Sequence, residues 1–131
     1  MPIKTEIDEL RRLKTVVFEG RITLSEFIEY RNTIVPDSMR NYDVCYADLS
    51  RITNFEFGFD AIMPHANRVS KLSNARGRFT EIILATNDLG FGFARMYEQL
   101  IGSDVDLRLF RDEAAAKAAL QAALSTLDAS S

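Results

Sequence analysis

The sequence predicts an α/β fold, in which an N-terminal β-hairpin and the strand-then-helix units behind it form a small mixed sheet. Short apolar segments bounded by polar residues alternate with amphipathic stretches that begin at helix-capping residues. Such alternation implies parallel strands joined by right-handed crossovers. The 131 residues, 47% of them hydrophobic, suffice for one globular domain. We therefore expect the element order ββαβαβαβα.

The N-terminal hairpin is predicted from two β-favouring segments. Residues 3–7 alternate apolar and polar side chains, and residues 13–19 contain the run Thr15-Val16-Val17-Phe18, which is typical of strands. The polar stretch 8–12 between them predicts the turn. Gly20 closes the second strand, because glycine tolerates the backbone conformations of tight turns.

The first helix is predicted to begin after Thr23, because Glu26 follows three residues later and completes a capping-box pattern. Pro36 is expected to end this helix, since the residue before a proline is disfavoured in the helical conformation. The apolar positions of one helical face are Leu24, Phe27, Ile28, Ile34 and Val35.

The next unit combines a buried strand over residues 43–49 with a loop over residues 54–60 and a helix behind it. Proline is tolerated only in the first turn of a helix, so Pro64 predicts a helix start between residues 60 and 63. Gly77 ends the helix. Its apolar stripe is Ile62, Ala66, Val69 and Leu72.

A further buried strand is predicted over residues 81–86, and Asn87 with Asp88 offers an N-cap for the helix that follows. Gly102 ends that helix. Its apolar positions are Phe93, Tyr97, Leu100 and Ile101.

The last unit is a strand over residues 105–111 and a helix over residues 113–124, which Asp112 caps. This helix is rich in alanine, so the surface against which it packs must approach closely. Residues 125–131 are expected to fray as a C-terminal tail. One domain over residues 1–124 remains.

Composition narrows the classes of partner and compartment. The chain has 19 acidic and 16 basic side chains, which disfavours nucleic-acid binding. Its single cysteine, Cys45, cannot form an internal disulfide, as suits a reducing compartment. Residues 1–6 resemble neither a signal peptide nor an anchor, and no apolar run approaches the roughly 20 residues that span a bilayer. We expect a cytoplasmic protein that is not membrane-bound.

Catalytic and metal-binding residues are scarce. The sequence has one histidine, His65, and one cysteine, Cys45. Structural zinc sites usually draw four ligands from these two residue types. Cys45 lies in the middle of an apolar strand, where a thiol is inert. We therefore predict no enzymatic activity, no metal and no cofactor. We interpret most carboxylates at strand ends and helix starts as caps; these are Asp43, Asp48, Glu56, Asp60 and Asp88.

A locally basic segment stands out in this acidic protein. Residues 61–80 contain no acid, while basic residues accumulate there with His65 nearby. The basic residues are Arg68, Lys71, Arg76 and Arg78. The segment is either a surface for an acidic partner or the solvated face of a helix.

Phenylalanines cluster in the two loops that follow predicted parallel strands, the edge where open α/β sheets usually place ligands. They are Phe55, Phe57, Phe59, Phe91 and Phe93. If several are exposed together, they mark an interface or an apolar pocket. Gly90 and Gly92 follow a strand and open a helix, so they either cradle a phosphate or allow close packing of helix and strand.

Three segments carry a resemblance to a known family: residues 19–23 (Glu-Gly-Arg-Ile-Thr), residues 46–50 (Tyr-Ala-Asp-Leu-Ser) and residues 105–114. They resemble the STAS-like domains, relatives of the anti-sigma-factor antagonists with the SpoIIAA-like fold. The resemblance covers residues 3–124. Residues 92–97 look like a helix start common in an uncharacterised bacterial branch of that superfamily.

The resemblance implies a domain without catalysis that binds a kinase-like protein or a sigma-factor regulator, often switched by serine phosphorylation. Family members carry an Asp-Ser-Ser-Gly segment where this chain has residues 55–58, Phe-Glu-Phe-Gly. The phosphoacceptor hydroxyl is therefore absent. Glu56 supplies a fixed charge beside that position, although a carboxylate is a weaker anion than phosphoserine. Ser50 and Thr53 are the candidate modification sites nearby.

We interpret the chain as a regulatory domain that docks another protein, or a second copy of itself as a homodimer. The alternative is a domain for a small apolar or anionic ligand, which the phenylalanines enclose and Arg95 or Asn87 caps. Both readings use the loops 54–60 and 87–93 and the intervening basic helix. The candidate residues are Phe55, Glu56, Phe57, Gly58, Phe59, Arg68, Lys71, Asn87, Asp88, Gly90, Phe91 and Arg95.

Overall fold

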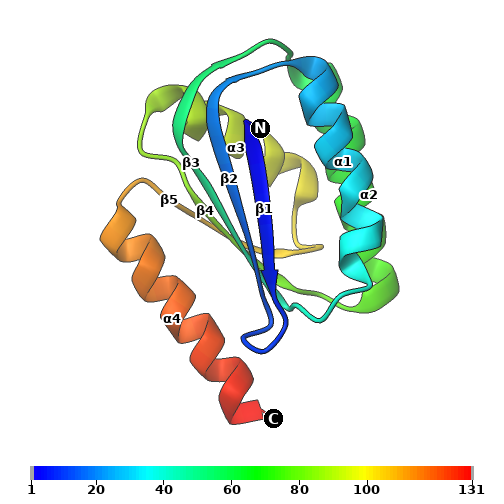
Figure 1. Ribbon diagram of the computed structural model, residues 1–131, viewed down its shortest axis with the longest axis vertical. Helices are drawn as coiled ribbons and strands as arrows, with labels where there is room; N and C mark the ends of the chain where they lie inside the picture. The colour runs from blue at the N-terminus through cyan, green and yellow to red at the C-terminus, as the bar shows by residue number, and fades with distance from the viewer. Residues whose placement is uncertain (1, 131) are drawn as a thin grey trace.

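The computed structural model describes residues 2–130, which form one five-stranded sheet with helices on both faces (Figure 1). The predicted order ββαβαβαβα and the mixed sheet are confirmed. In chain order the elements are β1 (Ile3–Asp8), β2 (Leu13–Ile22), α1 (Leu24–Ser38), β3 (Val44–Phe55), α2 (Phe59–Arg76), β4 (Thr80–Leu84), α3 (Asp88–Ile101), β5 (Asp106–Phe110) and α4 (Glu113–Ser130).

The strands lie in the sheet in the same order as in the chain. β1 pairs with β2 in the antiparallel sense, and every later neighbouring pair is parallel. Because each new strand is added on the same side of the one before it, right-handed crossovers place α1, α2 and α3 on one face. α4 follows the last strand and lies on the opposite face, against β3, β4 and β5 (Figure 1).

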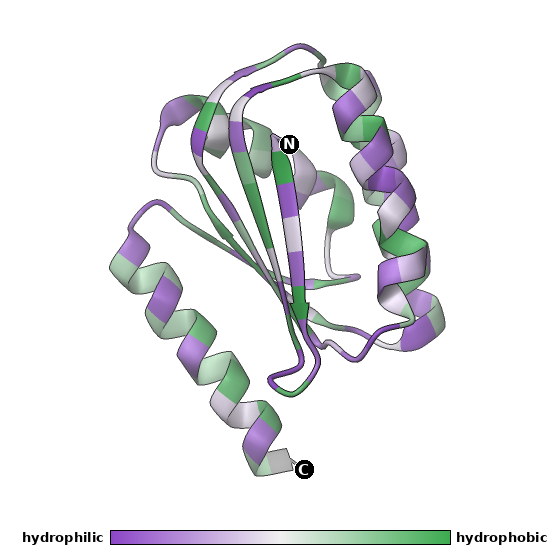
Figure 2. Cartoon of the chain, viewed as in Figure 1, coloured by the Kyte–Doolittle hydropathy of each residue, from purple (hydrophilic) through white to green (hydrophobic). Residues whose placement is uncertain are grey.

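Each face of the sheet has its own hydrophobic core. The larger core lies under α1, α2 and α3, where Phe27, Ile62 and Ile101 pack against Val16 and Ile83. The smaller core lies under α4, which carries hydrophobic residues along its whole length in Figure 2. The buried residues of the smaller core are Leu13, Val44, Tyr46, Ile82, Leu84, Ala116 and Leu124.

The predicted helix ends that depend on local chemistry are confirmed. Thr23 and Glu26 form the capping box, with the Glu26 amide donating to Thr23 Oγ1 at 3.2 Å and the Thr23 amide donating to Glu26 Oε1 at 2.8 Å. Gly77 and Gly102 end α2 and α3 with φ angles of 107° and 57°. These values lie in the region where side chains are strained, which explains why glycine occupies both positions.

Proline interrupts the helices less than expected. α1 continues past Pro36 to Ser38, whose hydroxyl donates to the Val35 carbonyl at 2.5 Å. α2 begins at Phe59, so Pro64 lies inside the helix and not in its first turn. In both cases the ring removes one N–H from the helix ladder while its neighbours remain helical. The predicted end at Pro36 is therefore wrong, and so is the placement of Pro64 in the first turn, although α2 begins only one residue before the predicted start near residues 60–63.

The connections at the carboxyl end of the parallel strands are shorter than the predicted loops 54–60 and 87–93. β3 continues to Phe55 because β2 is also long, and Ile22 at its end pairs with Phe55. Glu56 then donates its amide to the Ile22 carbonyl at 2.9 Å. Only residues 56–58 lie between β3 and α2, and residues 88–93 already belong to α3.

The final helix is longer than predicted. α4 continues through residues 125–130, which we expected to fray, and the half-buried Leu127 packs against the smaller core. Leu120, Leu124 and Leu127 recur at helical spacing, so the apolar stripe extends beyond residue 124. Residue 131 of the expected tail lies outside the described residues.

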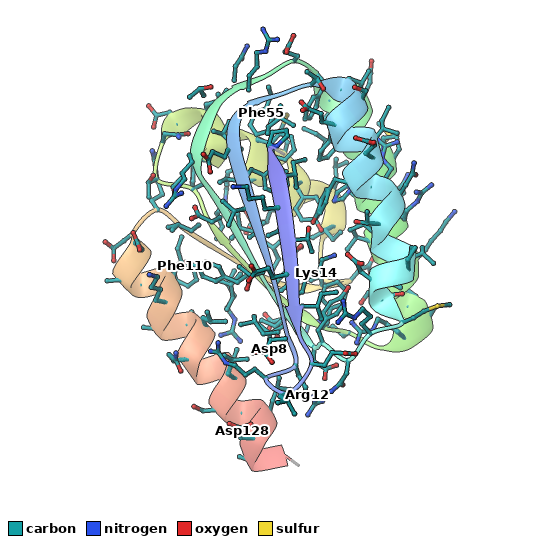
Figure 3. All side chains as sticks on the ribbon, viewed as in Figure 1. Asp8, Arg12, Lys14, Phe55, Phe110 and Asp128 are labelled. Atoms are coloured by element: carbon teal, nitrogen blue, oxygen red, sulfur yellow. The ribbon has the colours of Figure 1, made fainter. Side chains whose placement is uncertain are left out.

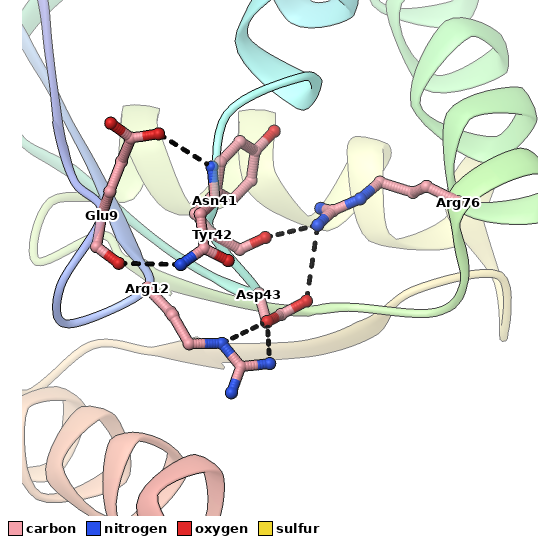
Figure 4. A network of polar contacts seen from close by, with 6 residues as sticks. All are labelled: Glu9, Arg12, Asn41, Tyr42, Asp43 and Arg76. Carbon is pink, nitrogen blue, oxygen red and sulfur yellow. Dashed lines mark hydrogen bonds and ion pairs between the residues drawn. The ribbon is translucent and has the colours of Figure 1, made fainter. Parts of the chain in front are cut away.

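A polar network closes the amino end of the parallel strands (Figure 4). Asp43, just before β3, accepts hydrogen bonds from Arg12 in the hairpin turn, with Arg12 Nε at 2.7 Å, and forms an ion pair with Arg76 at 3.4 Å. Arg76 also donates to the Tyr42 carbonyl. The network joins the hairpin turn, the start of β3 and the end of α2.

Lys14, labelled in Figure 3, is a buried cation on β2 that reaches the end of α1. Its side chain is 2% exposed and its Nζ lies 3.1 Å from Asp37 Oδ2 in the last turn of α1. The ammonium also lies over the rings of Tyr30 and Tyr42, at 5.7 Å and 5.5 Å from their centroids. A charge this deeply buried needs such partners, because water cannot reach it.

Replacing Asp37 with alanine is expected to lower the free energy of unfolding by about 3 kcal/mol, because it leaves a buried ammonium without its counter-charge. The double variant Asp37→Ala, Lys14→Met removes both charges and keeps an unbranched stem in place of the lysine, so it should cost less than about 1 kcal/mol or stabilise the fold. Urea denaturation of both variants measures the difference. Equal losses would show that packing, and not charge pairing, makes Lys14 necessary.

Leu124→Ala is expected to lower the free energy of unfolding by about 2 kcal/mol, because the leucine fills the smaller core under α4. Gln121→Ala on the exposed face of the same helix should change it by less than about 0.5 kcal/mol. The same urea titration tests both. A neutral Leu124→Ala would mean that the end of α4 adds nothing to the fold.

Candidate functional site

The phenylalanines at the carboxyl edge of the sheet form a cluster that is mostly packed inward. Phe55 stacks on Phe93 with ring centroids 4.2 Å apart, and Phe57 stacks on the fully buried Phe27 at 4.6 Å. Phe57 and Phe93 meet edge to face at 5.8 Å. Phe59, in contrast, is 45% exposed. Of the predicted loop phenylalanines, Phe59 is therefore the one that presents a large surface to a partner.

Asn87 holds the start of α3 against the end of β3. Its side-chain oxygen accepts from the Gly90 amide at 2.7 Å, and its Nδ2 donates to the carbonyls of Ser50 and Ile52 at 3.2 Å and 3.3 Å. A Cβ on Gly90 would lie 3.1 Å from the Leu49 carbonyl oxygen. This geometry supports close packing of helix and strand as the role of Gly90.

The remaining predicted residues of this edge form ion pairs or contacts near the surface. Arg111 joins Asp88 at 2.6 Å and lies over the Phe91 ring at 4.7 Å. Arg95 pairs with Glu98 on the next turn of α3 at 2.9 Å. Asp88 and Arg95 are thus paired at the surface, whereas Phe91 is half-buried and packs against the larger core, as Phe55, Phe57 and Phe93 do.

Glu56 and the two candidate modification sites, Ser50 and Thr53, have different surroundings. Glu56 pairs with Arg21 at 2.7 Å. The Ser50 hydroxyl donates to Asp48 Oδ1 at 2.5 Å, whereas Thr53 is exposed. Thr53 is thus the more accessible of the two candidate modification sites.

α2 presents its outer face to solvent between α1 and α3. Phe59 and Met63 are exposed by 45% and 40% at its beginning, and Arg68 and Lys71 are exposed further along. Within residues 2–130, no acidic side chain forms an ion pair with Arg68 or Lys71; Arg68 donates to Asn32 Oδ1 at 3.0 Å. We call these four residues the α2 outer face.

A groove of about 550 Å³ runs beside this face, between α1 and α2. Its walls combine aliphatic side chains with the two basic ones. They are Val35, Pro64, Asn67, Arg68, Lys71, Leu72 and Ala75. Arg76 and Arg78 do not belong to it, because Arg76 is bound at Asp43 and Arg78 donates to the Ser103 carbonyl at 3.1 Å.

The interior under α1, α2 and α3 contains titratable groups that the sequence analysis did not select as site residues. Glu81 on β4 accepts from the Tyr97 hydroxyl at 2.7 Å, and both side chains are buried. Burial raises the pKa of Glu81. The sequence did contain a signal for these buried groups, namely a charged residue inside an otherwise apolar strand. Lys14 in β2 and Glu81 in β4 are the two examples.

Nucleophilic chemistry finds no support in this interior. Burial raises the pKa of the Cys45 thiol to about 12, so the thiolate is not populated near neutral pH. Burial lowers the pKa of His65 to about 3. Residues 2–130 bring together no group of three or more histidine, cysteine, aspartate or glutamate side chains that could hold a metal ion. Within the same residues, no helix has the length and hydrophobicity needed to cross a membrane.

The fold is similar to that of solved proteins. The anti-sigma factor antagonist SpoIIAA in its unphosphorylated form matches with a TM-score of 0.63 and 12% identity, over 92% of this chain and 96% of that one. The Bacillus cell fate determinant SpoIIAA in its phosphorylated form matches with a TM-score of 0.56 and 15% identity, over 89% and 98% of the two chains. The predicted SpoIIAA-like fold is therefore confirmed.

An uncharacterised protein of the DUF3478 family with a SpoIIAA-like fold, from Shewanella loihica PV-4, matches with a TM-score of 0.49 and 15% identity, over 87% of this chain and 88% of that one. No protein-family model matches the sequence. A search of curated proteins finds no match either. The similarity thus lies in the fold.

Acid is expected to destabilise the protein through His65. Its pKa is lowered from 6.5 to about 3 by burial, with repulsion from Arg31, Lys14 and Arg68. The unfolded chain therefore takes up a proton near pH 6.5, whereas the folded chain resists it. The contribution of neutral His65 is complete above about pH 6.5 and is lost as the pH falls toward 3.

The measurement is urea unfolding from about pH 7 to about pH 4, for the native protein and for His65→Phe. The variant should lose less stability as the pH falls. Glu81 acts in the opposite direction, because its raised pKa costs stability as the pH rises above 4.5, and it is present in both proteins. Parallel curves for the two proteins would contradict the assignment to His65.

Proposed function

We propose that this chain is a non-enzymatic regulatory domain that docks a protein partner through the α2 outer face and the groove between α1 and α2. The observation that carries the proposal is the composition of α2, the central helix of its layer. Exposed Phe59 and Met63 lie at its start, and residues 61–80 contain no acid. Arg68 and Lys71, which form no ion pair within residues 2–130, lie further along. This is a surface with apolar anchors and basic charge.

The chemistry of the groove favours an acidic, amphipathic helix as the occupant. Helices bind in apolar grooves between other helices by inserting residues spaced at one or two turns. Val35, Pro64 and Leu72 supply the apolar walls for such residues. Arg68 and Lys71 at the rim favour acidic side chains, which sets orientation and speeds the encounter.

The likeness to SpoIIAA supports a regulatory role. SpoIIAA is described as an anti-sigma factor antagonist and as a cell fate determinant, and it is known in phosphorylated and unphosphorylated forms. At 12% and 15% sequence identity, these two comparisons show a similar fold and do not show a shared function. The step from fold to regulation therefore rests on the α2 outer face of this chain.

Control of docking by phosphorylation at the family position is not part of the proposal. Residues 55–58 contain no hydroxyl, and the charge of Glu56 is paired with Arg21. Phe57 and Phe55, which the sequence pointed to as docking residues, stack against Phe27 and Phe93. Substituting them would disturb the core, so Phe59 is the better residue for a test.

Selection of a displayed library of helical peptides on the native domain is expected to return acidic amphipathic sequences. Binding of a recovered peptide should weaken about tenfold or more in Phe59→Ser, which loses an apolar anchor. A similar loss is expected in the double variant Arg68→Glu, Lys71→Glu, which reverses the charge of the rim. Fluorescence anisotropy measures each affinity.

The matched controls place the same chemical changes elsewhere on the surface. Leu10→Ser removes a side chain that is 98% exposed in the hairpin turn, and Lys4→Glu reverses an exposed charge on β1. Both should leave binding unchanged. Peptides without acidic residues, or equal weakening by the controls, would refute docking at the α2 outer face.

A second measurement tests whether the partner is another copy of this chain. Light scattering over a concentration series gives the solution mass of the native domain and of Phe59→Asp. A native dimer that becomes a folded monomer in Phe59→Asp would identify the partner as a second copy of this chain. A native monomer would leave the foreign acidic helix as the occupant.

A further inference from the structure

A small cavity that opens to the surface lies between the sheet and the helices α1, α2 and α3. Its volume is about 30 Å³, and its polar lining comes from Tyr30, His65, Glu81 and Tyr97 on four different elements. These side chains are buried, whereas Phe93, also in the lining, is only half-buried. A water needs about 10–15 Å³ of such space, so the cavity has room for a hydroxyl and little more.

One residue of this lining, His65, carries a polar atom that has no partner among residues 2–130. His65 is 7% exposed, and its Nδ1 forms no hydrogen bond within the described part of the chain. Native proteins pair nearly all buried polar atoms, so such an atom calls for an occupant that the protein itself does not supply. Beside it, the Glu81 and Tyr97 side chains are paired with one another at 2.7 Å.

We propose that this cavity is a binding site for a small uncharged aromatic molecule that carries a hydroxyl group, which pairs with His65 Nδ1. A hydroxyl both donates and accepts, so it satisfies Nδ1 whichever ring nitrogen of His65 carries the proton. An aromatic body fits the surroundings of the imidazole. The rings of Phe27, Tyr30 and Tyr97 lie 5.0 Å, 5.6 Å and 5.7 Å from it.

The charges around the cavity favour a neutral ligand. Lys14 on β2 already has Asp37 as its counter-ion, and the Glu81 carboxyl already has the Tyr97 hydroxyl as a donor. A charged ligand would therefore lose its hydration without gaining an unpaired counter-charge. His65 stays neutral near neutral pH, because burial and nearby cations lower its pKa.

The aromatic ring of the ligand enters where Phe93 now lies. A cavity of about 150 Å³ is known to admit benzene, so 30 Å³ is too small for a ring until a side chain moves. Phe93 is half-buried and stacks on Phe55 at 4.2 Å, with edge contacts to Phe27 and Phe57. When it turns outward, a ligand ring takes up the same aromatic contacts.

The test titrates phenol into the native protein, with toluene as the matched ligand that lacks the hydroxyl. We expect saturable one-to-one binding, with phenol about tenfold tighter than toluene, the effect of one buried hydrogen bond. NMR should show a change in the ¹⁵N shift of His65 Nδ1 on binding of phenol and not of toluene. No saturable binding, or equal affinities for the two ligands, would overturn the proposal.

Three variants locate the site. Phe93→Ala should tighten both ligands by opening the mouth, and Phe93→Trp should weaken both by filling it. His65→Phe should keep toluene binding and lose the preference for phenol. Circular dichroism checks the folding of each variant, and if His65→Phe does not fold, the ¹⁵N shift in the native protein decides.

Two further outcomes count against the site. Phenol that binds Phe93→Ala and not the native protein would show a cavity made by the substitution. Exchange of water magnetisation with His65, without phenol binding, would show a hydration site alone. None of these variants touches the α2 outer face, so failure here leaves the docking proposal intact, and the reverse also holds.

Discussion

The buried ammonium of Lys14 constrains the arrangement of the larger core. A cation with 2% of its side chain exposed is tolerable only where counter-charge and aromatic faces converge on it. Asp37 supplies the charge from the last turn of α1, and Tyr30 and Tyr42 supply the ring faces. The contact between Lys14 and Asp37 therefore holds the end of α1 near β2. Because α2 packs beside α1, this contact also limits where α2 can lie.

Local chemistry explains why the order of elements was predictable from the sequence. Thr23, Asn87, Gly77 and Gly102 act through hydrogen bonds or backbone angles within a few residues, and all four do so in the structure. The prolines were less informative. At Pro36 and Pro64 the loss of one N–H is outweighed by tertiary packing, so the helices continue.

The candidate site was only partly predictable, because exposure depends on which helix faces meet. Phe57 and Phe59 are two residues apart and equally apolar, yet Phe57 stacks on Phe27 from α1 and Phe59 faces solvent. No local pattern separates them. Glu81 carried a signal, a charge inside an apolar strand, but its partner Tyr97 lies on α3 and is identified only when the helix is placed over the sheet.

α2 is the element on which the two proposed sites depend, and its two faces serve them separately. His65 points inward among Phe27, Tyr30 and Tyr97, while Phe59, Arg68 and Lys71 face outward. In the connection between β3 and α2, Glu56 forms an ion pair with Arg21 at 2.7 Å. We propose that electrostatic choice of a partner comes from Arg68 and Lys71, which form no ion pair within residues 2–130.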